Sequence, residues 1–279
     1  MRTLVISILC LASAAYAAET ASISAAPTSL ERGYNHAYNL DFTGAQHEFA
    51  AWEKAHPGEA LGPVSEGAGY LFSELNRLGV LETQFFSDDK KFLDRPKVSP
   101  DPKTKQQFDD ALTRAESEAQ QELGANPRDP DALFAMTLTY GLRADYVALV
   151  EKRNMASLSL TKQADGWAEK LLSQHPSYYD GYLATGLSKY ILGSLAAPVR
   201  WLLRLGGYSG GDKKEGMKEV QLVAERGHYL APFARMLLAI AYLRQKDPAK
   251  ARTLLEGLRQ DFPGNPLFTK EIARLDEAH

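Results

Sequence analysis

Cysteine is nearly absent from this sequence, which has a single one, Cys10, among its 279 residues. Because Cys10 lies inside the apolar N-terminal run, the chain after that run can form no disulfide and no thiolate metal site. Long apolar runs are also missing beyond the N-terminus, and none reaches the ~18 residues that a membrane-spanning helix needs. We therefore expect a chain without disulfides and without a transmembrane span after its first residues.

An excess of positive charge is missing as well. The 32 lysines and arginines are balanced by 35 aspartates and glutamates, which leaves a formal net charge of −3. No basic stripe with interleaved aromatic residues is present, so we expect no nucleic-acid partner. Alternating strand patterns are nearly absent, whereas the helical spacing of apolar residues dominates. The fold class that we predict is all-α.

The N-terminus has the three parts of an export signal. A single arginine is followed by the apolar run LVISILCLASAA, and the small residues Ala15 and Ala17 stand where a signal peptidase cleaves. This run is too short to span a bilayer, although an uncleaved N-terminal anchor is the competing interpretation. We predict a Sec-type signal peptide at 1–17, a flexible leader at 18–29 and a helical repeat domain at 30–279. The expected location is the periplasm or cell envelope.

Four predicted helices end in the same way. Each stops at a proline, an alanine lies twelve residues before that proline, and mostly apolar residues lie eight and five residues before it. The prolines are Pro57, Pro127, Pro176 and Pro263, and the alanines are Ala45, Ala115, Ala164 and Ala251. Proline cannot continue the helical hydrogen-bond ladder, and alanine lets two helices cross closely. The pattern predicts a series of helix hairpins, unless the alanines coincide by chance because alanine is abundant.

This spacing resembles the second helix of tetratricopeptide repeats (TPR). The last unit matches through both helices, from Leu238 and Tyr242 to Pro263, whereas the first departs from the usual pattern at His36 and Trp52. The prolines are 49 to 87 residues apart, farther than one repeat, which predicts longer or extra helices between them. The resemblance is to an exported bacterial TPR protein. It implies an α–α solenoid, a superhelical array of hairpins that binds partners on its surface.

The stretch GYSGGDKKEG at 207–216 has two further interpretations. It is similar to a loop in a TPR-like subgroup with members at eukaryotic outer membranes, except that Gly211 is inserted before Asp212. It also contains the G-x-S-x-G pattern of serine hydrolases, with Ser209 as the nucleophile. That hypothesis needs a parallel sheet around the motif, and the flanking sequence is helical. We expect a glycine joint with Asp212 as a helix N-cap, and no catalytic residue.

Metal binding has little support in the sequence. The six histidines form no pair with the spacing of a metal site, so we expect no metal and no cofactor. His56 and His175 each stand directly before a repeat proline, which favours a role at a helix C-terminus.

Residues 196–208 form a short amphipathic segment. Arg200 and Arg204 lie one helical turn apart, and Trp201 with several leucines covers most of the remaining surface. Such a segment can lie on a membrane surface. We favour a buried connecting helix, because two basic residues are few for lipid binding. A membrane-surface-associated envelope factor is therefore the alternative function.

The TPR pattern also predicts which side chains face a partner. They are Tyr34 and Tyr38 in the first unit and Phe233, Met236, Ile240 and Leu243 in the last. All are apolar or aromatic, so either the groove takes an apolar partner or neighbouring helices of the same chain fill it. We expect a non-catalytic exported scaffold that captures a protein or peptide partner, with serine hydrolysis through Ser209 as a remote alternative.

Overall fold

The computed structural model describes residues 26–81, 99–194 and 211–277. Eleven α-helices fill these three ranges, which contain no β-strand. The signal-peptide prediction and most of the predicted leader concern residues outside these ranges. The all-α prediction and the predicted array of helix hairpins are confirmed.

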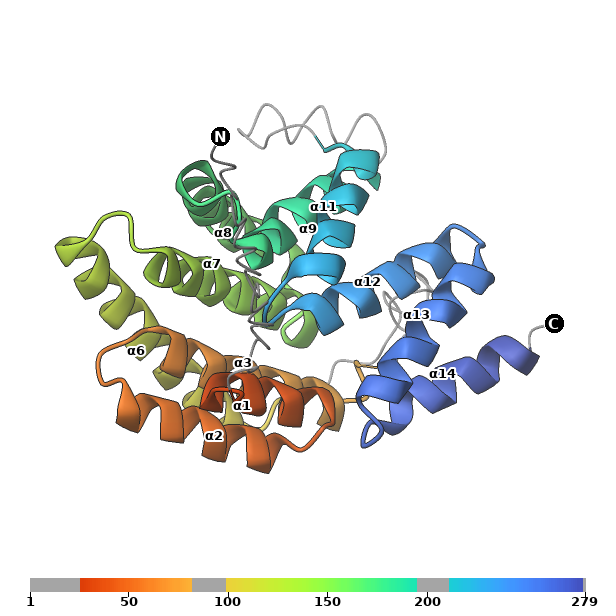
Figure 1. Ribbon diagram of the computed structural model, residues 1–279, viewed down its shortest axis with the longest axis horizontal. Coiled ribbons are helices and arrows are strands. Elements are labelled where there is room, and N and C mark those ends of the chain that lie inside the picture. Colours follow the sequence, from red (N-terminus) through yellow and green to blue (C-terminus); the bar gives the residue numbers. More distant parts are fainter. Residues whose placement is uncertain (1–25, 82–98, 195–210, 278–279) are drawn as a thin grey trace, which may run out of the picture.

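The helices pack as five consecutive pairs followed by one single helix. The pairs are α1 (Ser29–Tyr38) with α2 (Phe42–Ala55), α3 (Leu61–Arg77) with α6 (Pro102–Ala125), α7 (Pro130–Asp145) with α8 (Asn154–Gln174), α9 (Tyr182–Ser194) with α11 (Lys213–Arg226), and α12 (Ala231–Arg244) with α13 (Pro248–Asp261). The last helix, α14 (Pro266–Glu277), packs on α13. A π-helical turn (Tyr146–Val150) follows α7, and a 3-10 turn (Tyr179–Gly181) precedes α9. In Figure 1 the pairs follow one another around an arc, and α12–α14 return toward the first pair.

The start of α1 is fixed by a capping box. Thr28 accepts a hydrogen bond from the backbone N–H of Glu31 at 3.2 Å, and the Glu31 carboxylate accepts one from the backbone N–H of Thr28 at 2.6 Å. These two bonds satisfy amide groups that a helix start otherwise leaves without partners. The helix begins at Ser29, one residue before the predicted boundary of the repeat domain.

The repeated helix ends have the predicted structure. The helices α2, α6, α8 and α13 each end two residues before the repeat proline, and the residue directly before that proline has φ between −128° and −136°. Proline forces this extended conformation on its predecessor, which ends the helix. His56 and His175 occupy two of these C-cap positions, as predicted. The four alanines of the pattern are at most 3% exposed, so they lie in the helix crossings.

The wide spacing between the repeat prolines has two causes. The second helices α6 and α8 are 24 and 21 residues long. In addition, α9 and α11 form a complete extra hairpin, and α11 ends at Gly227 rather than before a proline. Both the longer and the extra helices that the spacing predicts are therefore present, although no repeat proline marks the end of the extra pair.

Glycines hold the extra hairpin together by letting α9 and α11 approach closely. A Cβ atom placed on Gly216 would lie 2.5 Å from the backbone oxygen of Gly186 and 2.5 Å from the backbone nitrogen of Tyr190. A Cβ atom on Gly211 would lie 2.0 Å from the backbone nitrogen of Gly193. Contacts this short are impossible, so Gly216 and Gly211, the last residue of the stretch that resembles a nucleophile motif, are both needed for packing.

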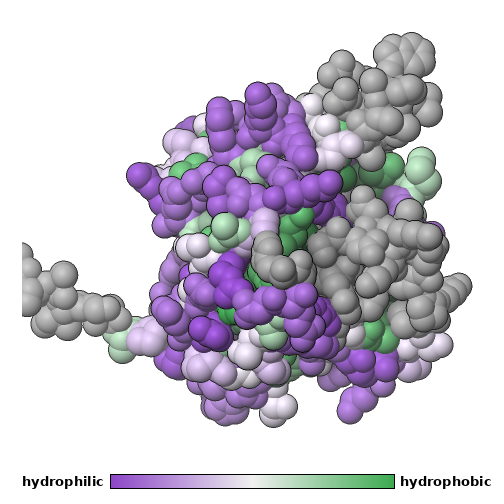
Figure 2. All heavy atoms as spheres, turned by 90° about the vertical axis from the view of Figure 1, so that its right-hand side faces the viewer, coloured by the Kyte–Doolittle hydropathy of each residue, from purple (hydrophilic) through white to green (hydrophobic). Residues whose placement is uncertain are grey.

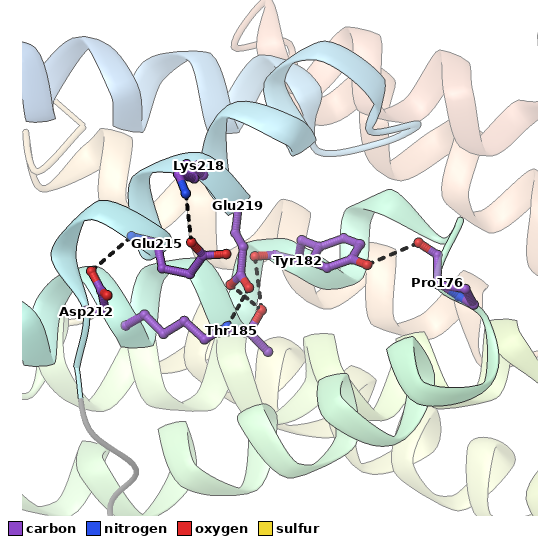
Figure 3. Close-up of polar contacts among 8 residues, drawn as sticks. Pro176, Tyr182, Thr185, Asp212, Glu215, Lys218 and Glu219 are labelled. Atoms are coloured by element: carbon purple, nitrogen blue, oxygen red, sulfur yellow. Dashed lines mark hydrogen bonds and ion pairs between the residues drawn. The ribbon is translucent and has the colours of Figure 1, made fainter.

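Polar contacts fix the same hairpin at its edge. Asp212 accepts the backbone N–H groups of Lys214 and Glu215 at 2.9 and 3.1 Å, which confirms it as the N-cap of α11. Figure 3 shows Asp212 at the start of α11 and Glu219 pointing at Thr185 of α9. The Thr185 hydroxyl donates to Glu219 at 2.8 Å.

The two ends of the described array touch each other. The Tyr38 hydroxyl donates to the backbone oxygen of Tyr229 at 2.8 Å, and the Asn265 amide donates to the backbone oxygen of Tyr38 at 2.9 Å. The ring of Tyr34 packs against that of Tyr229, with centroids 5.1 Å apart. His228 Nε2 lies 2.7 Å from Glu31 Oε1. We call these contacts the closure, because they join α1 to the segments before α12 and α14.

The buried carboxylate of Asp180 positions one side of the closure. It is 3% exposed and accepts the backbone N–H groups of His228, Tyr229 and Leu230 at 2.9, 3.1 and 3.0 Å. Burial raises the pKa of Asp180, and the three N–H donors oppose that shift. The loop that joins α11 to α12 is therefore held by a group at the start of α9.

We expect the alanine variants of two helical glycines to change stability in opposite directions. Gly216→Ala places a methyl group against the backbone of α9, so it is expected to lower the free energy of unfolding by about 1–3 kcal/mol. In the matched control Gly166→Ala, nothing lies within 4 Å of the new Cβ atom, and the gain in helix propensity is expected to raise that free energy by about 0.5–1 kcal/mol. Urea unfolding of both variants measures the difference. Equal effects would contradict the close crossing.

We expect the Glu31 carboxylate to stabilise the closure in a pH-dependent way. The hydrogen bond to His228 lowers the pKa of Glu31 to about 2 from 4.5, with further lowering from Thr28. A carboxylate whose pKa is lower in the folded state stabilises the fold above its unfolded pKa, and this contribution is lost as the pH falls from about 4.5 toward 2. Glu31→Gln keeps an acceptor for the capping box and removes the charge. It is expected to cost less than ~1 kcal/mol at pH 7, because both partners are partly exposed.

Urea unfolding of the parent and Glu31→Gln at several pH values between 7 and 3 checks this expectation. The difference between the two proteins should shrink below pH 4.5. As a control, carbon NMR titration should show that His228→Gln returns the Glu31 pKa toward 4.5. A difference in stability that stays constant over this range would argue against the ionic part of the closure.

Candidate binding sites

The inner helices of the array enclose an apolar cavity, which we call the central cavity. Side chains from α1, α2, α3, α7, α12 and α14 line it, and its volume is about 70 Å³. Four of the predicted partner-facing residues meet here: Tyr34 and Tyr38 from α1, and Phe233 and Met236 from α12. The structure therefore brings together residues from the first and last predicted units, and helices of the same chain fill most of the space between them.

The polar groups beside the central cavity already have partners within the chain. The Tyr34 hydroxyl shares a hydrogen bond of 3.0 Å with Ser65, and the Tyr38 hydroxyl takes part in the closure. Burial raises the pKa of Tyr34 to about 12 and that of Tyr38 well above its ordinary value. Both hydroxyls therefore stay neutral near pH 7, and neither is suited to exchange a proton with a ligand.

The two remaining polar residues of the wall come from the start of α14 and the loop before it. The Asn265 side chain donates to the Tyr38 backbone oxygen at 2.9 Å and accepts the Leu267 N–H at 3.0 Å. The buried carboxylate of Glu271 forms an ion pair with Arg274. The rest of the wall is apolar: Leu138 and Leu142 of α7, Phe72 of α3 and Leu230 before α12 are examples. The TPR pattern did not single out these four residues.

A second apolar concavity lies between α9, α11 and α12, and we call it the α9–α12 groove. It has a volume of about 140 Å³. Its apolar wall includes Leu187 and Ile191 of α9, Met217 of α11, and Leu237 and Ile240 of α12. Ile191 is 54% exposed, which is unusual for a large apolar side chain beside other apolar side chains. Of the predicted residues, only Ile240 lies in this groove.

The surface on the side of α12–α14 shows how apolar groups are distributed. In Figure 2, polar side chains cover most of the described surface, and apolar side chains are visible mainly in the hollow between the upper and lower parts of this face. Leu243, the last of the predicted residues, lines neither concavity. It packs against a small second core that includes Ala239, Leu255 and Phe268.

The hydrolase hypothesis has its nucleophile outside the part of the chain that the structure describes. Ser209 lies outside the described residues, as do Arg200, Trp201 and Arg204 of the predicted membrane segment. A hydrolase triad also needs a histidine and an acid; of the residues after Ser209, His228 is paired with Glu31, and Asp261 of α13 forms an ion pair of 2.7 Å with Arg235. The described ranges also lack the β-sheet on which a nucleophile elbow is built.

A buried carboxyl group with an unusual pKa lies elsewhere. Burial raises the pKa of Asp165 to about 6, although a hydrogen bond with Ser188 lowers it in part. Asp165 is on α8 and borders neither the central cavity nor the α9–α12 groove. In the part of the chain that the structure describes, no three His, Cys, Asp or Glu side chains form a group that could hold a metal ion. No helix in the same ranges is long and apolar enough to cross a bilayer.

One family model matches part of this chain. It is the tetratricopeptide repeat model, and it covers residues 232–275, which include most of α12, all of α13 and most of α14. The comparison with curated proteins gave no match, and the comparison with solved structures gave none either. The matched unit carries Phe233, Met236, Ile240 and Leu243. The protein is thus an all-α array of helix hairpins in which residues 232–275 match the tetratricopeptide repeat model.

Proposed function

We propose that this chain is a non-catalytic, exported scaffold that captures a protein or peptide partner in the periplasm or cell envelope. The exposed apolar side chain of Ile191 in the α9–α12 groove carries the proposal. TPR arrays bind protein partners on surfaces built by consecutive helices, and three helices of this array form the groove. The signal peptide that the sequence predicts at residues 1–17 supports the location.

The groove suits an apolar face of a partner better than a charged tail. Leu187, Ile191, Met217 and Leu237 form a wall without a carboxylate-binding pair of lysine and asparagine. An amphipathic helix presents apolar side chains at every third or fourth position, and such helices commonly dock into apolar grooves. The partner that fits the α9–α12 groove is therefore a segment with an apolar stripe. No covalent chemistry is required of the scaffold.

We expect a photo-crosslinking amino acid at position 191 to capture a partner in cells, because Ile191 lies in the groove. The matched control is position 155: Met155 is also a large exposed apolar side chain, 79% exposed, but it lies on α8 outside the groove. Mass spectrometry of the adducts identifies the partner. Adducts of the same protein at both positions, or none at position 191, would contradict docking in the groove.

The identified partner then allows a quantitative test. Ile191→Asp is expected to weaken its binding by about tenfold or more, because a carboxylate in an apolar interface loses its hydration. Met155→Asp should leave binding unchanged. Calorimetric titration with the purified partner measures both effects, and equal weakening by the two variants would argue against the groove.

A further inference from the structure

The central cavity has a second property that partner capture in the α9–α12 groove does not use. Six helices line it and leave it partly open, and its polar groups are already paired: Tyr34 with Ser65, Tyr38 with the Tyr229 backbone, and Glu271 with Arg274. A peptide segment in this cavity would bury N–H and C=O groups without partners, which is costly. A hydrocarbon has no such groups, so it loses nothing on leaving water.

We propose that the central cavity binds the unbranched alkyl chain of a free, single-chain amphiphile. The small volume of the cavity favours a narrow, unbranched ligand. A cavity of about 150 Å³ is known to accommodate benzene, whereas the central cavity measures about 70 Å³. The end of an alkyl chain is the narrowest apolar group that fills such a space. Its polar head stays outside the cavity in water, because the polar groups of the wall already have partners within the chain.

The cavity also links parts of the chain that are distant in sequence. Ala37 and Tyr38 on α1 face Phe233 and Met236 on α12 across it. An alkyl chain between them makes dispersion contacts with both ends of the closed array and removes apolar surface from water. Binding therefore stabilises the closed arrangement by mass action.

Calorimetric titration of the purified protein with straight-chain 1-alkanols tests the proposal. Affinity is expected to rise about fourfold per added methylene until the cavity is full, because each buried methylene contributes about 0.8 kcal/mol. Two control ligands are 1,8-octanediol, which has a polar group at both ends, and N-acetyl-leucinamide, which carries backbone amides. Both should bind at least tenfold more weakly than 1-octanol. Comparable binding of either control would overturn the proposal.

Two variants with opposite effects show where the ligand binds. Ala37→Leu fills the cavity and is expected to reduce 1-octanol affinity by about tenfold or more, whereas Met236→Ala enlarges it and should move the preferred chain to a greater length. Ala50→Leu is the matched control for Ala37→Leu, because Ala50 is exposed on α2 and does not line the cavity. Circular dichroism and melting temperature establish that each variant is folded. Unchanged binding in folded Ala37→Leu would overturn the site.

Two further measurements are needed. One tests whether the alkyl chain comes from a free amphiphile or from a bilayer, and the other tests whether the cavity and the groove bind independently identified ligands. Vesicle flotation with phosphatidylcholine tests whether a bilayer supplies the chain: vesicle binding that Ala37→Leu abolishes would overturn the proposal of a free ligand. In the absence of a partner, Ile191→Asp should leave 1-octanol binding intact, and Ala37→Leu should still capture the partner at position 191, even where the filled cavity changes the affinity of the groove. A failure of the groove proposal and a failure of the cavity proposal are thereby distinguishable.

Discussion

The closure between α1 and α12 depends on the hydrogen bonds that the Asp180 carboxylate accepts. It accepts three consecutive backbone N–H groups, from His228 to Leu230, in a site with almost no solvent exposure. Three charge-assisted hydrogen bonds to one buried carboxylate hold the loop in one conformation. Tyr229 then packs on Tyr34 and accepts the Tyr38 hydroxyl, and α12 begins at a position where Phe233 faces α1 across the cavity. This anchor thereby positions the α12 side of the central cavity.

The close crossing of α9 and α11 has a corresponding role for the groove. Because Gly186 and Gly216 carry no side chains, the two helices approach until backbone atoms are in contact. The apolar side chains that flank the crossing, among them Leu187, Ile191 and Met217, are therefore placed on the outer side of the hairpin toward α12. Larger residues at the crossing would separate the helices and widen the groove. Packing inside the hairpin thus shapes the surface outside it.

Much of the fold could be predicted from sequence because its signals are local. The alanine-to-proline spacing predicts where α2, α6, α8 and α13 end, since proline acts on the residue before it. The wide spacing of the prolines also predicts extra helices, but not the bounds of the hairpin α9–α11, whose second helix is followed by Gly227 rather than by a proline. The TPR pattern predicts that residues of the first and last units face a groove. Two of them, Tyr34 and Phe233, do line one cavity. Leu243, also predicted, packs instead against the small core of α12–α14. Which face of a helix meets a distant helix depends on tertiary packing, and so does the anchoring role of Asp180.

The two concavities share α12, and this has a physical consequence. Phe233 and Met236 of α12 line the central cavity, while Leu237 and Ile240, each about one helical turn further along α12, line the α9–α12 groove. A ligand in the cavity that favours one position of α12 changes the shape that the groove offers to a partner. By thermodynamic linkage, a partner that favours the same position strengthens binding in the cavity by the same factor. Because α12 lines both apolar sites, a ligand in one site changes the affinity of the other. The size of this change is set by how strongly each ligand prefers one position of α12 over another.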